Sequence, residues 1–306
     1  MTLHIQTPLI ESGALAGAAG QQVWLKMEAL QPPGSFKLRG IGYACEEYLK
    51  RGARRFVSSS GGNAGIAAAY AGRKLGVPVL VVVPETTTDR AKELIRREQA
   101  DIVVHGASFQ EANARAMAML EPDDAFIHPF NDPLLWAGHA SMIDEVAQAG
   151  LAPDAVVLSV GGGGLLCGVV EGLRRQGWDQ VPVFAVETQG ADSLSQALAA
   201  GERIELPRIS SIATSLGARQ VSEQAFALAH SHPVRSLVVS DQAAVAACLR
   251  FMDDQRLVVE PACGASLAVV YGQAGELAPY KRVLVIVCGG VTATVAQLNQ
   301  WATSRK

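Results

Sequence analysis

The sequence has little charge, few cysteines and no long apolar run. Only 18% of its 306 residues are charged and the net charge is −3, which excludes nucleic-acid binding by bulk charge. With 49% hydrophobic residues, the chain is not disordered. Its most apolar stretches, 79–83 and 283–287, fall far short of the roughly 18 residues that span a bilayer.

The distribution of cysteines predicts a reducing compartment. They are scattered, odd in number and never spaced CxxC, which argues against a disulfide framework or a structural zinc site. The first 12 residues show no basic and apolar leader pattern. We therefore expect a cytoplasmic protein with no nucleic-acid or membrane partner. The five cysteines are Cys45, Cys167, Cys248, Cys263 and Cys288.

Short β-type runs alternate with helical patterns along most of the chain. Several are continuous Val/Ile/Leu runs, typical of strands buried on both faces. The alternation predicts right-handed βαβ crossovers and two mainly parallel α/β domains without a flexible linker. Expected strands lie at 22–28, 55–59, 77–83, 101–104, 125–128, 154–160, 181–187, 235–240 and 282–288. Five helices are expected to end at Gly52, Gly76, Gly150, Gly177 and Gly201.

Three glycine-rich joins each follow an expected strand. They are SSSGGNAG at 58–65, VGGGGLLCG at 160–168 and VCGGVTAT at 287–294. In open α/β sheets, ligands collect at the carboxyl ends of strands. We therefore expect the three joins to contribute to one composite pocket.

The four glycines at 161–164 are suited to anion binding. A side-chain-free loop that enters a helix presents backbone N–H groups at the positive end of the helix dipole. A tight strand-to-helix turn is the plainer interpretation, although one glycine would suffice for that. No Gly-Lys-Ser/Thr follows, which excludes the nucleoside-triphosphate loop. A dinucleotide site remains an alternative, because Gly162, Gly164 and Cys167 nearly fit GxGxxG and Glu187 ends the next expected strand.

Lys37 in GSFKLRG (34–40) is a candidate for imine chemistry. Partial burial lowers the pKa of a lysine and frees its neutral amine. A phosphate loop together with such a lysine suggests a phosphorylated aldehyde held as a Schiff base. The alternative is that Lys37 is an ordinary solvated charge on a helix, and the composition does not decide between the two.

A set of motifs in this order resembles the fold-type II pyridoxal-phosphate enzymes. The set comprises GSFKLRG, SSSGGNAGIAAAYAGRKLG, GGGGLL, ETQGADS, TSLGA, EPACGASLA and VIVCGG, and it extends over nearly the whole chain. Within that family the sequence is most similar to L-serine/L-threonine dehydratases of the serine dehydratase and serine dehydratase-like type. The resemblance implies a tryptophan synthase β-like α/β fold with two open, mostly parallel sheets. A large cofactor-binding domain would comprise 1–37 and 135–306, with a small α/β domain at 38–134 inserted in it.

The resemblance also implies roles for individual residues. Lys37 would be catalytic and form the Schiff base with pyridoxal 5′-phosphate, while Phe36 packs on the ring and Asn63 binds its 3′ oxygen. Cys288 would meet the pyridine nitrogen, although a small buried hydrophobe is the commoner fate of such a cysteine. The cofactor phosphate would bind Gly161, Gly162, Gly163, Gly164 and Leu165. The substrate carboxylate would bind Ser60, Gly61, Gly62, Asn63 and Ala64.

A monovalent cation, expected to be potassium, is implied by ETQGADS and TSLGA. The alternative is that Glu187 is simply an acid at a strand end. The small-molecule partner would be an amino acid, and the family suggests a homodimer. The cation ligands would be Glu187, Ser193 and the backbone carbonyls of Gly161, Ala191, Leu216 and Ala218.

Gly61 bears on the type of reaction. Racemases of this fold place a serine hydroxyl there as a second acid/base, so we expect poor racemisation here. The missing Cβ is expected to enlarge the carboxylate pocket. The resemblance thus implies β-elimination of water from serine or threonine followed by release of ammonia, with β-replacement or racemisation as alternatives. His128 and His139 are expected to have packing roles, and no GxSxG elbow supports a serine nucleophile.

Overall fold

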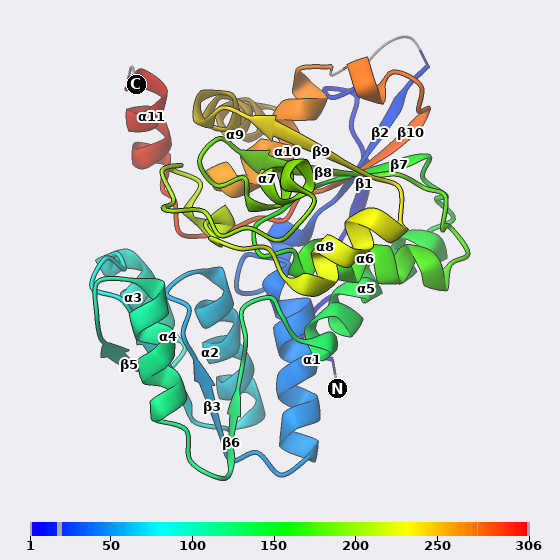
Figure 1. Ribbon diagram of the computed structural model, residues 1–306. Coiled ribbons are helices and arrows are strands. Elements are labelled where there is room, and N and C mark those ends of the chain that lie inside the picture. Colours follow the sequence, from blue (N-terminus) through cyan, green and yellow to red (C-terminus); the bar gives the residue numbers. More distant parts are fainter. Residues whose placement is uncertain (1, 17–19, 274, 305–306) are drawn as a thin grey trace.

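The computed structural model describes residues 2–16, 20–273 and 275–304. Within them the strands form two separate sheets (Figure 1). The first has six strands in the order β1-β2-β10-β7-β8-β9, and the second has four in the order β5-β4-β3-β6. The strands are β1 (Leu9–Glu11), β2 (Gln22–Lys26), β3 (Arg55–Ser58), β4 (Val79–Val83), β5 (Asp101–Val104), β6 (Asp124–Phe126), β7 (Ala155–Ser159), β8 (Val183–Thr188), β9 (Val234–Val239) and β10 (Arg282–Ile286).

Both sheets are parallel apart from β1, which pairs antiparallel with β2. The residues of β4, β7 and β8 are all buried, which explains their continuous apolar runs. All nine strands expected from the sequence are present, with ends shifted by up to two residues. The edge strand β1 was missed because its three residues, Leu-Ile-Glu, are partly exposed and carry no strand pattern.

Helices lie between the strands. The five glycines expected to end helices all have positive φ, between 69° and 98°, as a left-handed C-terminal position requires. The helices are α1 (Lys37–Lys50), α2 (Asn63–Leu75), α3 (Asp89–Arg97), α4 (Phe109–Ala118), α5 (Pro133–Gln148), α6 (Gly164–Arg175), α7 (Ser193–Ala200), α8 (Glu223–Ser231), α9 (Asp241–Gln255), α10 (Pro261–Tyr271) and α11 (Val295–Thr303).

In the sequence, the strands of the four-stranded sheet are inserted between strands of the six-stranded sheet. Strands β3 to β6 fall between β2 and β7, and Figure 1 shows them with α2, α3 and α4 as a separate lobe below the larger sheet. The predicted fold class is therefore confirmed. Because β10, β7 and β8 are neighbours and parallel, the loops that follow them lie at one edge of the larger sheet.

Among the described residues, no helix is both long and apolar enough to cross a bilayer. Three short 3₁₀ helices complete the secondary structure: η1 (Glu28–Leu30), η2 (Thr214–Leu216) and η3 (Gly275–Leu277). Two of them matter for the site, since η1 lies just before Lys37 and η2 lies beside the glycine loop.

Candidate functional site

Lys37 is the first residue of α1, and the turn before it is held against the end of β10. The Phe36 N–H donates to the Cys288 carbonyl at 3.1 Å, and Ser35 forms an isolated antiparallel bridge with Gly289. Gly34 has φ +83°, and a Cβ built on it would lie 2.2 Å from Val291 Cγ1. This close approach places Lys37 and Cys288 in the same part of the molecule.

Lys37 is half-buried, and the pKa of its amine is lowered. Its Nζ donates to the Pro129 carbonyl at 2.6 Å. Burial lowers its pKa to about 8, an effect that the nearby Cys288 and Glu260 partly oppose. About a tenth of the amine is therefore neutral at pH 7, which is the form that attacks aldehydes and accepts protons.

The glycine loop at 161–164 lies near the Lys37 amine, because both contact the segment 129–130. Phe130, the residue after Pro129, packs so closely on the loop that a Cβ on Gly162 would lie 2.3 Å from its ring. Gly163 has φ +92° and is the N-cap of α6, where no side chain caps the helix. The loop must therefore lack side chains, and no side chain of the described residues accepts from the first N–H groups of α6.

Replacing Gly162 with alanine should weaken anion binding at this loop, because the new Cβ requires Phe130 to move. We expect the affinity for pyridoxal phosphate, the cofactor that the resemblance implies, to fall about 10-fold or more, measured by fluorescence titration. Gly13→Ala is the matched control, since a Cβ there meets nothing within 4 Å and Gly13 is exposed. Equal affinities for the two variants would contradict this account of the loop.

Asn63 is the first residue of α2, whose N-cap, Gly62, provides no side-chain hydrogen bond. The Asn63 side chain reaches the larger lobe, because its Oδ1 accepts from the Val291 N–H at 3.1 Å and its Nδ2 donates to Glu260 Oε1 at 2.7 Å. Nδ2 also lies 3.3 Å from Ser215 Oγ. These contacts bring the 58–65 join to the loop after β10.

The space beside Gly61 is not empty. A Cβ built there would lie 2.5 Å from Thr87 Oγ1 and 2.7 Å from Thr87 Cγ2. The expectation that the missing Cβ enlarges the pocket is therefore wrong, because a side chain from the loop after β4 fills the room. Ser60 stays close to its own loop, with its Oγ accepting from the Gly62 N–H at 3.3 Å.

The surroundings of Cys288 favour its neutral thiol form. It is 7% exposed, and its pKa lies well above the ordinary value because of the neighbouring Cys263 thiol and burial. A protonated thiol is a weak hydrogen-bonding group that carries no charge. It lies close enough to Lys37 to be among the groups that affect the pKa of that amine.

The residues expected to bind a cation form two groups, at the ends of β7 and β8. Glu187 is fully buried and accepts from the Leu194 and Ser195 N–H groups at 2.9 and 2.8 Å, while burial raises its pKa to about 8. Ser193 Oγ is buried and has no hydrogen-bond partner within the described part of the chain. Ala191 pairs with Thr188.

The second group lies at η2. A Cβ on Gly161 would be 2.9 Å from Leu216 Cα and 3.2 Å from the Leu216 carbonyl oxygen, which also accepts from the Ala218 N–H at 2.8 Å. Residues 2–16, 20–273 and 275–304 contain no group of three or more His, Cys, Asp or Glu suited to a metal. Any cation held here would depend on carbonyl and hydroxyl oxygens around a single carboxylate.

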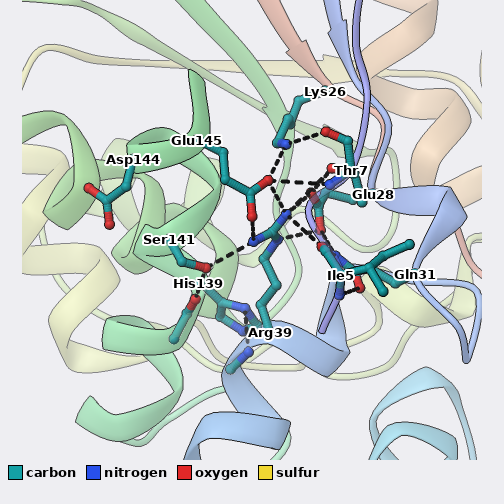
Figure 2. Close-up of polar contacts among 12 residues, drawn as sticks. Ile5, Thr7, Lys26, Glu28, Gln31, Arg39, His139, Ser141, Asp144 and Glu145 are labelled. Atoms are coloured by element: carbon teal, nitrogen blue, oxygen red, sulfur yellow. Dashed lines mark hydrogen bonds and ion pairs between the residues drawn. The ribbon is translucent and has the colours of Figure 1, made fainter. Parts of the chain in front are cut away.

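A buried charge cluster surrounds Arg39, which lies two residues after Lys37 on α1 (Figure 2). Arg39, fully buried on α1, donates to both oxygens of Glu28, with Nε at 2.7 Å from Oε2. It also donates to both oxygens of Glu145 at 2.7 Å, and Lys26 pairs with the same carboxylate. Next to the cluster, His139 Nδ1 accepts from the Gly40 N–H at 3.1 Å. The cluster fixes the start of α1 to β2, η1 and α5.

Sequence reasoning missed several residues at this site. Pro129 and Phe130 follow β6 with no motif, although His128 Nδ1 fixes their loop by accepting from the Phe130 and Asn131 N–H groups. The ring of His139 packs on Phe36 with centroids 4.9 Å apart, which agrees with an expected packing role. Glu260 lies in the motif EPACGASLA, but the motif alone does not indicate what this glutamate does.

Comparison with known proteins identifies the family. Residues 1–289 match the family model described as pyridoxal-phosphate dependent enzyme. The chain belongs to this family. It is 49% identical to the human L-serine dehydratase/L-threonine deaminase over 97% of this chain and 94% of that protein. It also resembles a crystal structure of a fungal L-serine ammonia-lyase from Rhizomucor miehei, with TM-score 0.93, 34% identity and 98% of each chain covered. The structure of maize serine racemase matches with TM-score 0.87 and 25% identity, over 97% of this chain and 91% of that one.

The residues present fit the family's cofactor. Lys37 provides an amine with a lowered pKa, and the glycine loop beside it has no room for a Cβ. Cys288, whose surroundings favour the neutral thiol, lies in the same region. The dinucleotide alternative does not fit, since Glu187 is fully buried and both its oxygens accept from the first turn of α7. The resemblance to fold-type II pyridoxal-phosphate enzymes is confirmed.

Proposed function

We propose that this protein is a pyridoxal-phosphate-dependent dehydratase of L-serine and L-threonine. It would remove water by β-elimination and release ammonia, giving pyruvate or 2-oxobutanoate. The observation that carries this proposal is the near full-length likeness to the human L-serine dehydratase/L-threonine deaminase. The half-buried Lys37 amine beside a side-chain-free loop supports it.

Bound pyridoxal phosphate would supply an aldehyde for covalent attachment and a ring that withdraws electrons from the substrate's α-carbon. Lys37 would attach the cofactor and then carry the α-proton, a task suited to an amine whose pKa is about 8. The N–H groups of Gly161 to Leu165 would hold the phosphate, and Phe36 would pack on one face of the ring. The substrate carboxylate would accept from N–H groups between Ser60 and Ala64, at the uncapped start of α2.

Asn63 and Cys288 would set the electronic state of the ring. Asn63 would bind the 3′ oxygen, and the Cys288 thiol would meet the pyridine nitrogen. Since this thiol is neutral, it would not keep the nitrogen protonated, so the ring would be a weak electron sink. That suits β-elimination, in which the departing hydroxyl takes the electrons from the α-carbon. Racemisation would be slow, because Gly61 provides no second acid/base.

The test of this function is direct. L-serine added to the purified, cofactor-loaded protein should release ammonia and an equal amount of 2-oxo acid. The absorbance of the bound cofactor should change on addition, and borohydride should fix the cofactor on Lys37. Failure to release 2-oxo acid from either L-serine or L-threonine contradicts the proposal. Product formation only when a thiol or sulfide is added indicates β-replacement, and D-serine formation indicates racemisation.

We also propose a potassium site formed by Glu187, Ser193 and the carbonyls of Gly161, Ala191, Leu216 and Ala218. Support comes from the buried Glu187 carboxylate and the buried Ser193 hydroxyl without a partner in the described residues. The same family reasoning proposes the domain limits 1–37 with 135–306 and 38–134, a homodimer and a cytoplasmic location.

Glu187→Gln should abolish activation by potassium. In the wild type, replacing tetramethylammonium chloride by potassium chloride at constant ionic strength should raise both the thermal midpoint and the rate of 2-oxo acid release, about 10-fold for the rate. The glutamine variant keeps the shape of the side chain but cannot ionise to face a bound cation, so it should give the same values in the two salts. Glu202→Gln, on the exposed turn after α7, is the control that retains the response. A wild type indifferent to the two salts would exclude the site.

A further inference from the structure

Glu260 is a buried carboxylate beside the proposed cofactor site, and the mechanism above gives it no role. It is the N-cap residue of α10, yet its side chain makes no capping bond to that helix. It is 4% exposed, and its oxygens accept from other elements: Oε1 from Asn63 Nδ2 at 2.7 Å and Oε2 from Thr292 Oγ1 at 2.6 Å. The Thr292 N–H adds a longer contact to Oε2 at 3.4 Å.

A glycine in the loop after β10 makes room for this carboxylate. Gly290 has φ +108°, and a Cβ built on it would lie 2.0 Å from Glu260 Cδ and 2.3 Å from Oε2. Any side chain at 290 would displace the carboxyl group. The second glycine of VCGG and the glutamate of EPACGASLA therefore belong to one arrangement.

Glu260 also fixes which way the Asn63 amide faces. Oδ1 of Asn63 accepts from the Val291 N–H, while Nδ2 gives one hydrogen to Glu260. A carboxylate accepts only, so the nitrogen must face it. The second hydrogen of Nδ2 makes only a longer hydrogen bond, to Ser215 Oγ at 3.3 Å, and a ligand that accepts this hydrogen would replace that bond.

We propose that Glu260 is a positioning residue that orients the Asn63 amide, so that its remaining N–H donates to the 3′ oxygen of pyridoxal phosphate. The inference rests on the proposed function, which places that oxygen beside Asn63. The same carboxylate ties the first turn of α2 to the loop after β10, and so joins the two lobes at the cofactor ring.

The test compares the affinities of the apoenzyme for pyridoxal phosphate and 3-deoxypyridoxal phosphate, which lacks the ring oxygen. The wild type should prefer pyridoxal phosphate by about 10-fold or more, as expected for a hydrogen bond to a charged group. Glu260→Gln removes the negative charge and places an NH₂ against either Asn63 Nδ2 or the Thr292 N–H, both of which are donors, so it should reduce the preference to about 2-fold or less. Glu260→Asp, which keeps the charge but withdraws it from Asn63, should also lose the preference.

Two further variants separate positioning from general stability. Asn63→Ala should lose the preference, and adding Glu260→Gln to it should change the preference no further, because both act through one contact. Thr292→Val removes the hydrogen bond from Thr292 Oγ1 to Glu260 without touching the Asn63 contact, so it should lower the thermal midpoint while keeping the preference. Because each preference compares two ligands on one protein, a loss of stability alone does not alter it.

The outcomes are distinguishable. The inference is overturned if Glu260→Gln keeps the wild-type preference, if its effect adds to that of Asn63→Ala, or if the wild type has no preference. A wild-type apoenzyme that binds neither compound contradicts the proposed function itself. Binding with the expected preference, but without release of 2-oxo acid from serine or threonine, supports the role of Glu260 and contradicts the proposed reaction.

Discussion

Replacing Lys37 with alanine should lower the release of 2-oxo acid from L-serine by about 10³-fold or more, with the fold intact. The variant loses both the amine that would attach the cofactor and the group that would carry the α-proton, and a general acid–base step alone contributes about 10²–10⁴-fold. The amine makes one hydrogen bond, to the Pro129 carbonyl, so its removal costs little stability. A coupled assay for 2-oxo acid and the circular dichroism spectrum measure the two effects.

Lys50→Ala is the matched control, because Lys50 is the last residue of the same helix and its side chain is 68% exposed. It should keep wild-type turnover and spectrum. A Lys37→Ala protein that still turns over serine at a comparable rate would remove Lys37 from the mechanism. Partial recovery of the alanine variant on adding a small primary amine would support the assignment of the lost function to the amine itself.

The sequence predicts the parts of this protein that depend on local pattern. Continuous apolar runs such as 79–83 identify buried parallel strands, and glycine after a helix identifies its end, as Gly76 and Gly201 illustrate. The glycine loop at 161–164 has a local signal too, since consecutive glycines at a strand end serve few purposes. These predictions need no knowledge of distant contacts.

Contacts between distant residues carry no such signal. Pro129 meets the Lys37 amine from 92 positions away, and Glu260 meets Asn63 from 197 positions away. Thr87 occupies the room beside Gly61, which the missing Cβ of that glycine was expected to leave open. The motifs thus indicate which segments form the site, while the side chains that position its groups emerge only when the two lobes come together.

The charge cluster around Arg39 should be the most sensitive structural feature of this region. Arg39→Met is expected to lower the free energy of unfolding by about 3–5 kcal/mol, since it leaves the fully buried Glu28 without its cationic partner. Urea unfolding of the apoprotein measures this effect. Arg282→Met is the control, because the Arg282–Asp154 pair is 43% and 31% exposed and should contribute about 1 kcal/mol or less.

A double variant tests whether the cost comes from an unpaired charge rather than from lost packing. Glu28→Met combined with Arg39→Met removes one charge of each sign and leaves Lys26 paired with Glu145. It should be more stable than the sum of the two single changes implies, by about 1–3 kcal/mol. Strict additivity would mean that packing of the long side chains, and not charge compensation, holds the first turn of α1 in place. The position of the Lys37 amine would then depend on side-chain packing alone. Arg39→Lys, which preserves the charge, would lower the free energy of unfolding as much as Arg39→Met does.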